Sequence, residues 1–89
     1  MNFQGALFVI DAGQIRAARG FLNWSQGDLA DRAKLSVQTV KRMELKGTDA
    51  STRANVHSVM RVLEDAGCLF LPDDGNGPGV RAKVPAVDE

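Results

Sequence analysis

The chain has 89 residues, 44% of them hydrophobic and 25% charged, which fits one small globular domain with a core just large enough to fold alone. The 11 Lys and Arg residues balance 11 Asp and Glu residues, and a net charge of zero argues against a protein that coats nucleic acid without specificity. No apolar run approaches the ~18 residues of a membrane helix, and no basic segment precedes an apolar run at the N-terminus, so we expect a cytoplasmic protein.

The residues that usually carry catalysis or bind metals are scarce. The one cysteine, Cys68, has no partner for an internal disulfide, and the one histidine, His57, adds too few ligands for a metal site. No glycine-rich phosphate loop and no cluster of ligand side chains accompanies them. We therefore expect no enzyme activity, no metal and no cofactor.

The first clear pattern is a helix that starts after Asp11. Asp11 and Gln14 have the spacing of a capping box, and Ile10 and Ile15 have that of a hydrophobic staple. The preceding residues 6–10 (ALFVI) are apolar and β-prone. They are expected either to pack under this helix or to add a short strand to a sheet.

This first helix has a buried face and an exposed face. Its apolar residues recur at i, i+3 and i+7, and they are Ile15, Ala18 and Leu22. Arg16 and Arg19 fall outside this stripe, so we expect both to be solvated charges on the surface. The helix should end between residues 20 and 23.

A second, shorter helix is expected over residues 25–33. Ser25 is followed three residues later by Asp28, which is an aspartate variant of the capping box. Trp24 and Leu29 stand where a hydrophobic staple would fix the direction of the incoming chain. These signals agree on the position of the first turn.

A third helix, over residues 36–45, follows almost at once. Ser36 is its cap, and the two linking residues, Lys34 and Leu35, leave room only for a sharp corner. We expect its inner face to carry Val37, Val40, Met43 and Leu45. Its outer face carries hydrogen-bond donors, which are Gln38, Thr39, Lys41 and Arg42. On residue types alone, these donors fit a solvated helix face as well as a surface that contacts nucleic acid.

The last helix is expected from its cap at Thr52 to Ala66, and Gly67 is the residue that ends it. Its apolar stripe consists of Val56, Val59, Met60, Leu63 and Ala66. After Gly67 the pattern changes from the helical period to alternation, which is typical of strands.

Two short strands are predicted next, over residues 68–71 and 80–84. The residues between them, 72–79 (PDDGNGPG), are rich in turn formers. Because an isolated hairpin is only marginally stable in water, these strands need a partner. That partner is either residues 6–10 of the same chain or the same hairpin of a second subunit. Residues 85–89 are expected to fray.

Residues 24–44 resemble the helix-turn-helix of the XRE family, which includes phage Cro proteins and repressors. The shared pattern is W-S-Q-x-x-L-A-x-x-A-x-L-S-x-x-T-V-x-R-x-E, carried by Trp24, Ser25, Gln26, Leu29, Ala30, Ala33, Leu35, Ser36, Thr39, Val40, Arg42 and Glu44. The resemblance extends from about Gln14 to Gly67, and more loosely to Val84. Lys34 stands where the family usually has glycine, which implies a left-handed residue at a cost of about 1 kcal/mol. The segment from Glu44 to Gly47 is one residue longer than the usual E-x-G.

The resemblance implies a fold and a function. It predicts a mainly α fold, a compact four-helix bundle like that of lambda repressor over residues 1–67, including an N-terminal arm. The strand pair, residues 68–84, would follow as the dimerisation element. It also implies a dimeric, sequence-specific DNA-binding regulator of transcription, a repressor on a palindromic operator. The helix over residues 36–45 would enter the major groove of double-stranded DNA, and the helix over residues 25–33 would cross the backbone.

Single residues receive roles from this placement. Base readout is assigned to Val37, Gln38 and Arg42, because Gln can pair with adenine, Arg with guanine, and Val can cover a thymine methyl group. Phosphate contacts are assigned to Gln26, Ser36, Thr39, Lys41 and Lys46. Gln26 has an alternative role, which is to brace a side chain that reads a base.

The apolar residues of the strand pair are assigned to a homodimer interface, and they are Leu69, Phe70, Leu71, Val80 and Val84. A second interpretation keeps the fold but makes the chain a protein-interaction module, such as an antitoxin or an adaptor with a protein partner. The sequence does not specify the operator, the regulated genes, or repression rather than activation.

Overall fold

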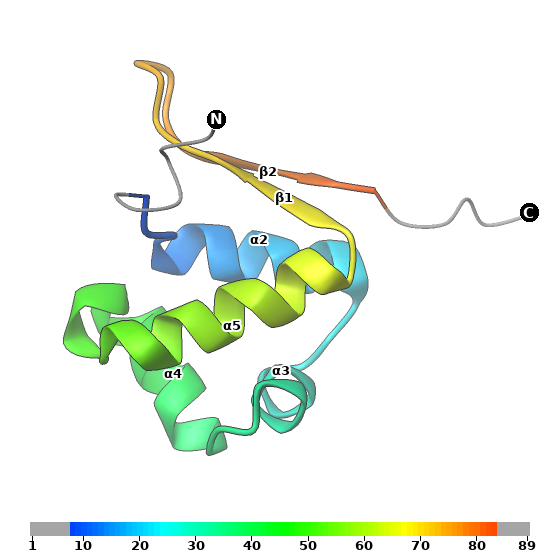
Figure 1. Cartoon of the computed structure of the whole chain (residues 1–89), viewed down its shortest axis with the longest axis vertical. Helices are drawn as coiled ribbons and strands as arrows, with labels where there is room; N and C mark the ends of the chain where they lie inside the picture. Colours follow the sequence, from blue (N-terminus) through cyan, green and yellow to red (C-terminus); the bar gives the residue numbers. More distant parts are fainter. Residues whose placement is uncertain (1–7, 84–89) are drawn as a thin grey trace, which may run out of the picture.

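The computed structural model describes residues 8–83 and is mainly helical, with one antiparallel strand pair, as the sequence predicts (Figure 1). Its elements in chain order are α2 (Ala12–Leu22), α3 (Gln26–Ala33), α4 (Val37–Lys46), the 3-10 turn η1 (Thr48–Ala50), α5 (Arg53–Asp65), β1 (Cys68–Leu71) and β2 (Gly79–Ala82). The expectations for Ala6, Leu7, Val84 and residues 85–89, and for the part of the N-terminal arm that precedes residue 8, lie outside the described residues. Within residues 8–83, no helix has both the length and the apolarity needed to cross a bilayer.

Helix α2 begins where the sequence predicts. The backbone N–H of Gln14 donates to Asp11 Oδ1 at 2.8 Å, and the N–H of Asp11 donates to Gln14 Oε1 at 3.0 Å, which completes the capping box. The helix ends at Leu22, and its C-cap residue, Asn23, adopts a left-handed conformation with φ 60°. Asparagine is one of the residues that tolerate this conformation.

One core joins the helices to the segment before them. Ile10 is fully buried, and its carbonyl accepts a hydrogen bond from the buried hydroxyl of Thr48 at 2.8 Å. Residues 8–10 form no strand, so the described part of residues 6–10 packs against the helices instead. The fully buried side chains of this core are Ile10, Ile15, Leu29, Val40, Met43, Val59 and Leu63.

The hairpin covers the side of the bundle formed by α2 and α5, away from α3 and α4 (Figure 1). Strand β1 pairs antiparallel with β2, with Cys68 opposite Ala82 and Phe70 opposite Val80. The second strand is Gly79–Ala82, not residues 80–84, and so starts one residue earlier than expected. Period-two alternation does not show where pairing stops, because the last hydrogen bonds depend on the partner strand.

Phe70 corrects part of the expected dimer interface. Its side chain is only 4% exposed, because the face of β1 that carries Cys68 and Phe70 lies on the bundle of its own chain. Leu71 and Val80 are half-buried, and only Leu69 among the described interface candidates is largely exposed. The hairpin therefore already has a partner, which is the pair of helices α2 and α5.

Gln14 ties the hairpin to α2. Its amide Nε2 donates to the carbonyl oxygen of Leu71 at 3.0 Å and to that of Gly79 at 2.9 Å, where the two strands open into the loop. The same side chain caps α2 through Oε1. A buried amide with all its polar groups in use fixes the relative position of the elements that it joins.

Candidate nucleic-acid interface

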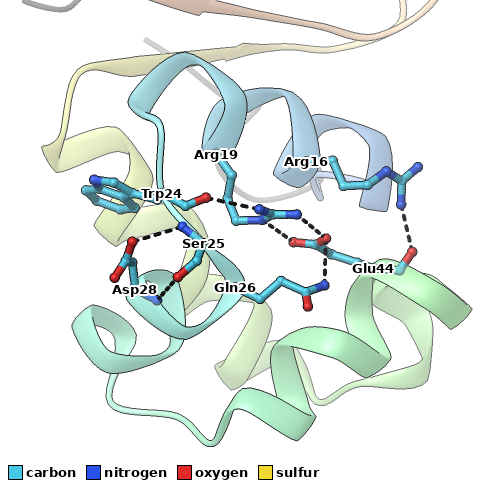
Figure 2. A network of polar contacts seen from close by, with 7 residues as sticks. All are labelled: Arg16, Arg19, Trp24, Ser25, Gln26, Asp28 and Glu44. Atoms are coloured by element: carbon cyan, nitrogen blue, oxygen red, sulfur yellow. Dashed lines mark hydrogen bonds and ion pairs between the residues drawn. The ribbon is translucent and has the colours of Figure 1, made fainter.

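Helix α3 begins with the capping box that the sequence predicts. The N–H of Asp28 donates to Ser25 Oγ, and the N–H of Ser25 donates to Asp28 Oδ2, both at 2.9 Å (Figure 2). The backbone hydrogen bond from Ser25 holds the pKa of the Asp28 carboxyl below its ordinary value, with help from the Ser25 hydroxyl. The carboxylate at this end of α3 also suits the positive end of the helix dipole.

The corner between α3 and α4 is as tight as expected. Lys34 is left-handed, with φ 59°, and the N–H of Leu35 donates back to the carbonyl of Ala30 at 2.9 Å. Helix α4 then starts at its cap, where Ser36 Oγ accepts from the N–H of Thr39 at 3.1 Å. Ala30 is buried, and a small side chain at that position lets α3 and α4 approach closely.

The inner face of α4 differs from the one predicted. Val40 and Met43 are buried as expected, but the third buried residue is Glu44, and Leu45 is 82% exposed. Each residue turns a helix by about 100°, so positions i, i+3 and i+4 from Val40 share a face and Leu45 is turned away from it. The prediction followed apolarity instead of the helical period and was wrong for Leu45 and for Val37, which is 36% exposed.

The outer face of α4 presents the proposed base-reading residues to solvent. Gln38, Lys41, Arg42 and Lys46 are exposed, and Val37 is 36% exposed at the first helical position. Within residues 8–83, the side chains of these four polar residues make no hydrogen bond and no ion pair. Their donors are therefore free to meet a ligand along one side of a helix.

Three of the expected phosphate contacts are already engaged within the chain. The hydroxyls of Ser36 and Thr39 lie 2.9 Å apart and bond to each other at the start of α4. Gln26 Nε2 donates to Glu44 Oε1 at 3.1 Å, so one amide N–H of Gln26 points toward the core of the motif. Lys41 and Lys46 remain exposed, as expected for phosphate contacts.

Glu44 is the centre of a polar network that connects α2, α3 and α4 (Figure 2). Its carboxylate accepts Arg19 Nε at 2.7 Å and Arg19 Nη2 at 2.8 Å, and its backbone carbonyl accepts Arg16 Nη1 at 2.7 Å. Arg19 Nη1 also donates to the carbonyl of Trp24 at 3.0 Å. The hydrogen bonds to Glu44 raise the pKa of Arg19 against the opposing effect of burial.

This network corrects the expectation that Arg16 and Arg19 are only solvated charges. Arg19 makes a two-point ion pair with a carboxylate that is nearly inaccessible, since the side chain of Glu44 is 4% exposed. The sequence signal was the position of Glu44 on the same helical face as Val40, which places a charge in the core and requires a partner. A second cation contact lies on α3, where the Arg32 guanidinium stacks 4.3 Å from the centre of the Trp24 ring.

No model of a known protein family matches the chain, and no curated protein matches it. Within residues 8–83, no group of three or more His, Cys, Asp or Glu side chains is placed to hold a metal ion. The geometry of α3 and α4 is therefore the feature of the chain that bears most directly on function.

Proposed function

We propose that the chain is a dimeric, sequence-specific DNA-binding regulator of transcription, similar to XRE-family repressors, that acts in the cytoplasm and has no enzyme activity. The observation that carries the proposal is the pair of short helices α3 and α4, joined by a three-residue corner, with free donors along the exposed side of α4. A helix-turn-helix of this kind places its second helix in the major groove.

The outer side chains of α4 then have distinct roles. Gln38 and Arg42 suit adenine and guanine, because each offers a bidentate pair along a base edge. Val37, at the first turn, suits a thymine methyl group. Lys41 and Lys46 supply positive charge for phosphates, which gives affinity without sequence information.

Gln26 has a narrower role than a free amide would have. One of its N–H groups is committed to the Glu44 carboxylate, and a carboxylate accepts hydrogen bonds only. The second N–H and the carbonyl oxygen remain for DNA or for a neighbouring side chain. Glu44 therefore acts as a positioning residue for Gln26 as well as an anchor for Arg19.

The direct test is selection of bound sequences from a pool of random duplex DNA. We expect one enriched palindrome, because two α4 helices related by a two-fold axis read the same half-site in opposite directions. A pool that remains random after repeated rounds would contradict sequence-specific binding. A single enriched half-site without a repeat would contradict the dimer.

One observation favours the alternative of a protein-interaction module such as an antitoxin or adaptor. Leu45 is 82% exposed and lies on the outer side of α4, where an apolar side chain suits a protein surface better than a phosphate. Under this alternative, Leu45→Lys abolishes capture of a specific partner from host extract, while DNA selection enriches nothing. Under the DNA-binding proposal, Leu45→Lys leaves the selected sequence unchanged.

A further inference from the structure

Within residues 8–83 the sheet has only two strands, so β1 and β2 each have one edge without a strand partner, and the hydrogen-bond pattern shows which backbone groups lie there. The N–H of Lys83 donates to the carbonyl of Gly67 at 2.7 Å, so these two residues occupy a hydrogen-bonded position of the ladder, although the N–H of Gly67 itself donates to the carbonyl of Glu64. Hydrogen-bonded and non-hydrogen-bonded positions alternate along an antiparallel ladder, so Leu69 and Arg81 occupy the next hydrogen-bonded position. The residues between them direct their N–H and C=O groups away from the partner strand, and these are Cys68 and Phe70 on β1, and Val80 and Ala82 on β2.

The two free edges differ in charge. Strand β1 contains no charged residue, whereas Arg81 lies within β2 and Lys83 directly follows it. If β2 paired with its own copy around a two-fold axis at Arg81, the two Arg81 side chains would face each other. An axis at Ala82 would place Arg81 opposite Lys83, and like charges in opposed positions are destabilising. An axis at Val80 would use Pro78, which has no N–H to donate.

The edge of β1, unlike that of β2, has no charged side chain to oppose pairing with its own copy. Leu69 is 51% exposed on the outer face of the sheet, in the middle of an uncharged strand. A two-fold axis at Leu69 pairs Cys68 of each copy with Phe70 of the other, so every outward backbone group of these residues gains a partner. Sliding the register to an axis at Phe70 would bring in Pro72, which lacks an N–H.

From this geometry we propose that two copies of the chain join through the free edges of β1, with Leu69 against Leu69 on the two-fold axis. This inference rests on the dimer of the proposed function and identifies its contact. The two Leu69 residues form a pair without mutual hydrogen bonds, which is the position where side chains in an antiparallel ladder approach most closely.

The same arrangement orients both candidate DNA-binding surfaces alike. A two-fold axis perpendicular to the sheet leaves the inner faces of both hairpins on one side, together with the helices that pack on them. Helix α4 lies on the far side of the bundle from the hairpin (Figure 1). Both α4 helices therefore face the same way, as a palindrome requires. A shift by one residue is excluded, because it would turn the second bundle to the opposite face.

The first experiment is cross-linking of the full chain in a Cys68→Ala background, so that each variant has one thiol. In the proposed pair, the Cα atoms of residue 69 lie about 4.5 Å apart, within the range of a disulfide. Leu69→Cys should form a covalent dimer under mild oxidation, and Arg81→Cys, on the same outer face of β2, should remain mostly monomeric. Equal or better cross-linking through Arg81→Cys overturns the proposal, and so does the absence of cross-linking at position 69.

The second experiment measures the dissociation constant of the dimer by sedimentation. Leu69→Lys should weaken the dimer about tenfold or more, since it sets two cations against each other on the axis. Leu45→Lys, the same change at another exposed leucine, should leave the dimer unchanged. A wild-type chain that stays monomeric, or a dimer insensitive to Leu69→Lys, overturns the proposal. A dimer that behaves as expected but enriches no DNA sequence overturns the proposed function and leaves this interface standing.

Discussion

At the scale of single residues, Arg42 and Lys41 are adjacent exposed cations on α4 with different chemistry. The guanidinium of Arg42 can make two parallel hydrogen bonds to one guanine, whereas the ammonium of Lys41 acts as a point charge. We predict that Arg42→Ala costs about 1–3 kcal/mol on the selected sequence and relaxes preference at one base position per half-site. The measurement is a binding titration against a panel of single-base variants of the operator.

Two matched variants control for charge alone. Lys41→Ala should weaken operator and random DNA by similar factors and reduce the salt dependence by about one unit per half-site. Arg61→Ala removes the same charge from the exposed side of α5 and should change neither quantity strongly. If Arg42→Ala weakens all sequences equally, Arg42 contacts phosphate and its assignment to base readout is wrong.

The pair formed by Glu44 and Arg19 permits a prediction about stability. Glu44→Gln keeps the size of the side chain but removes the charge that the two Arg19 nitrogens contact. We expect the free energy of unfolding to fall by about 1–3 kcal/mol, less than for a fully buried pair, because the Arg19 side chain is 19% exposed. Urea denaturation of both proteins measures this change in unfolding free energy. Glu64→Gln, an exposed change on α5, should be neutral, and an equal loss there would contradict the role of the pair.

The residues at helix starts were predictable, and the residues that connect elements were not. Capping depends on neighbours within three positions, so Asp11 with Gln14 and Ser25 with Asp28 could be identified from spacing alone. Burial of Glu44 depends on Arg19, which lies 25 positions earlier in the chain. Only the packing of α2 against α4 brings the two side chains together. For the candidate interface, exposure of Gln38 was predictable, but the engagement of Gln26 was not.

At the scale of elements, the capping box of α3 predicts a pH dependence. The pKa of Asp28 is lower in the folded chain than its ordinary value of 3.8, so its contribution to stability is present above that value. It is lost as the pH falls through the lower pKa of the folded state, because a protonated carboxyl is a weaker acceptor for the Ser25 N–H. In Asp28→Asn the acceptor does not titrate.

The measurement is urea denaturation of wild type and Asp28→Asn from about pH 6 to about pH 2.5. The difference in unfolding free energy between the two proteins should shrink as the pH falls. A difference that stays constant over this range would mean that the Asp28 carboxylate does not stabilise α3.

Gly67 connects α5 to β1 at a point where a side chain would approach the backbone of Lys83 closely. Its φ is +112°, and a Cβ atom there would lie 2.5 Å from the carbonyl oxygen of Lys83. Gly75, in the hairpin loop, has a similar φ of +106° but open space around it. We therefore expect both Gly67→Ala and Gly75→Ala to lose the roughly 1 kcal/mol of a left-handed alanine, and Gly67→Ala to lose clearly more. Thermal unfolding compares them, and equal losses would show that the close approach of Lys83 is relieved at little cost.

Elements were predicted better than their ends. The four helices and β1 begin within a residue of their expected positions, because caps, apolar period and glycine stops all agree there. The register of β2 and the packing of residues 8–10 depend on contacts with distant parts of the chain, which short-range sequence patterns do not encode.

At the scale of the whole molecule, the hairpin belongs to the same core as the helices. Phe70 and Cys68 are buried against the bundle, and Gln14 of α2 holds the carbonyls of both strands. The sequence suggested a separate dimerisation element over residues 68–84, since the apolar residues there had no visible partner within the chain. A dimer through β1 needs only the strand edge and Leu69, so burial of the inner face and dimerisation are compatible.

Because the hairpin and the helices share one core, we expect a substitution that weakens the packing of the hairpin to destabilise the helices as well. Phe70→Leu removes buried volume from β1 and should lower the unfolding free energy by about 1–2 kcal/mol. The fluorescence of Trp24, the only tryptophan, reports on the start of α3, far from β1 in the sequence. At one fixed protein concentration, the Trp24 transition and the far-UV circular dichroism transition should shift together, because a single cooperative unit unfolds as a whole.

Asp74→Ala, which removes only the local contact to the Asn76 N–H in the loop, should shift neither. If the midpoint of the Trp24 transition does not shift in Phe70→Leu, the strand pair unfolds independently of the helix bundle.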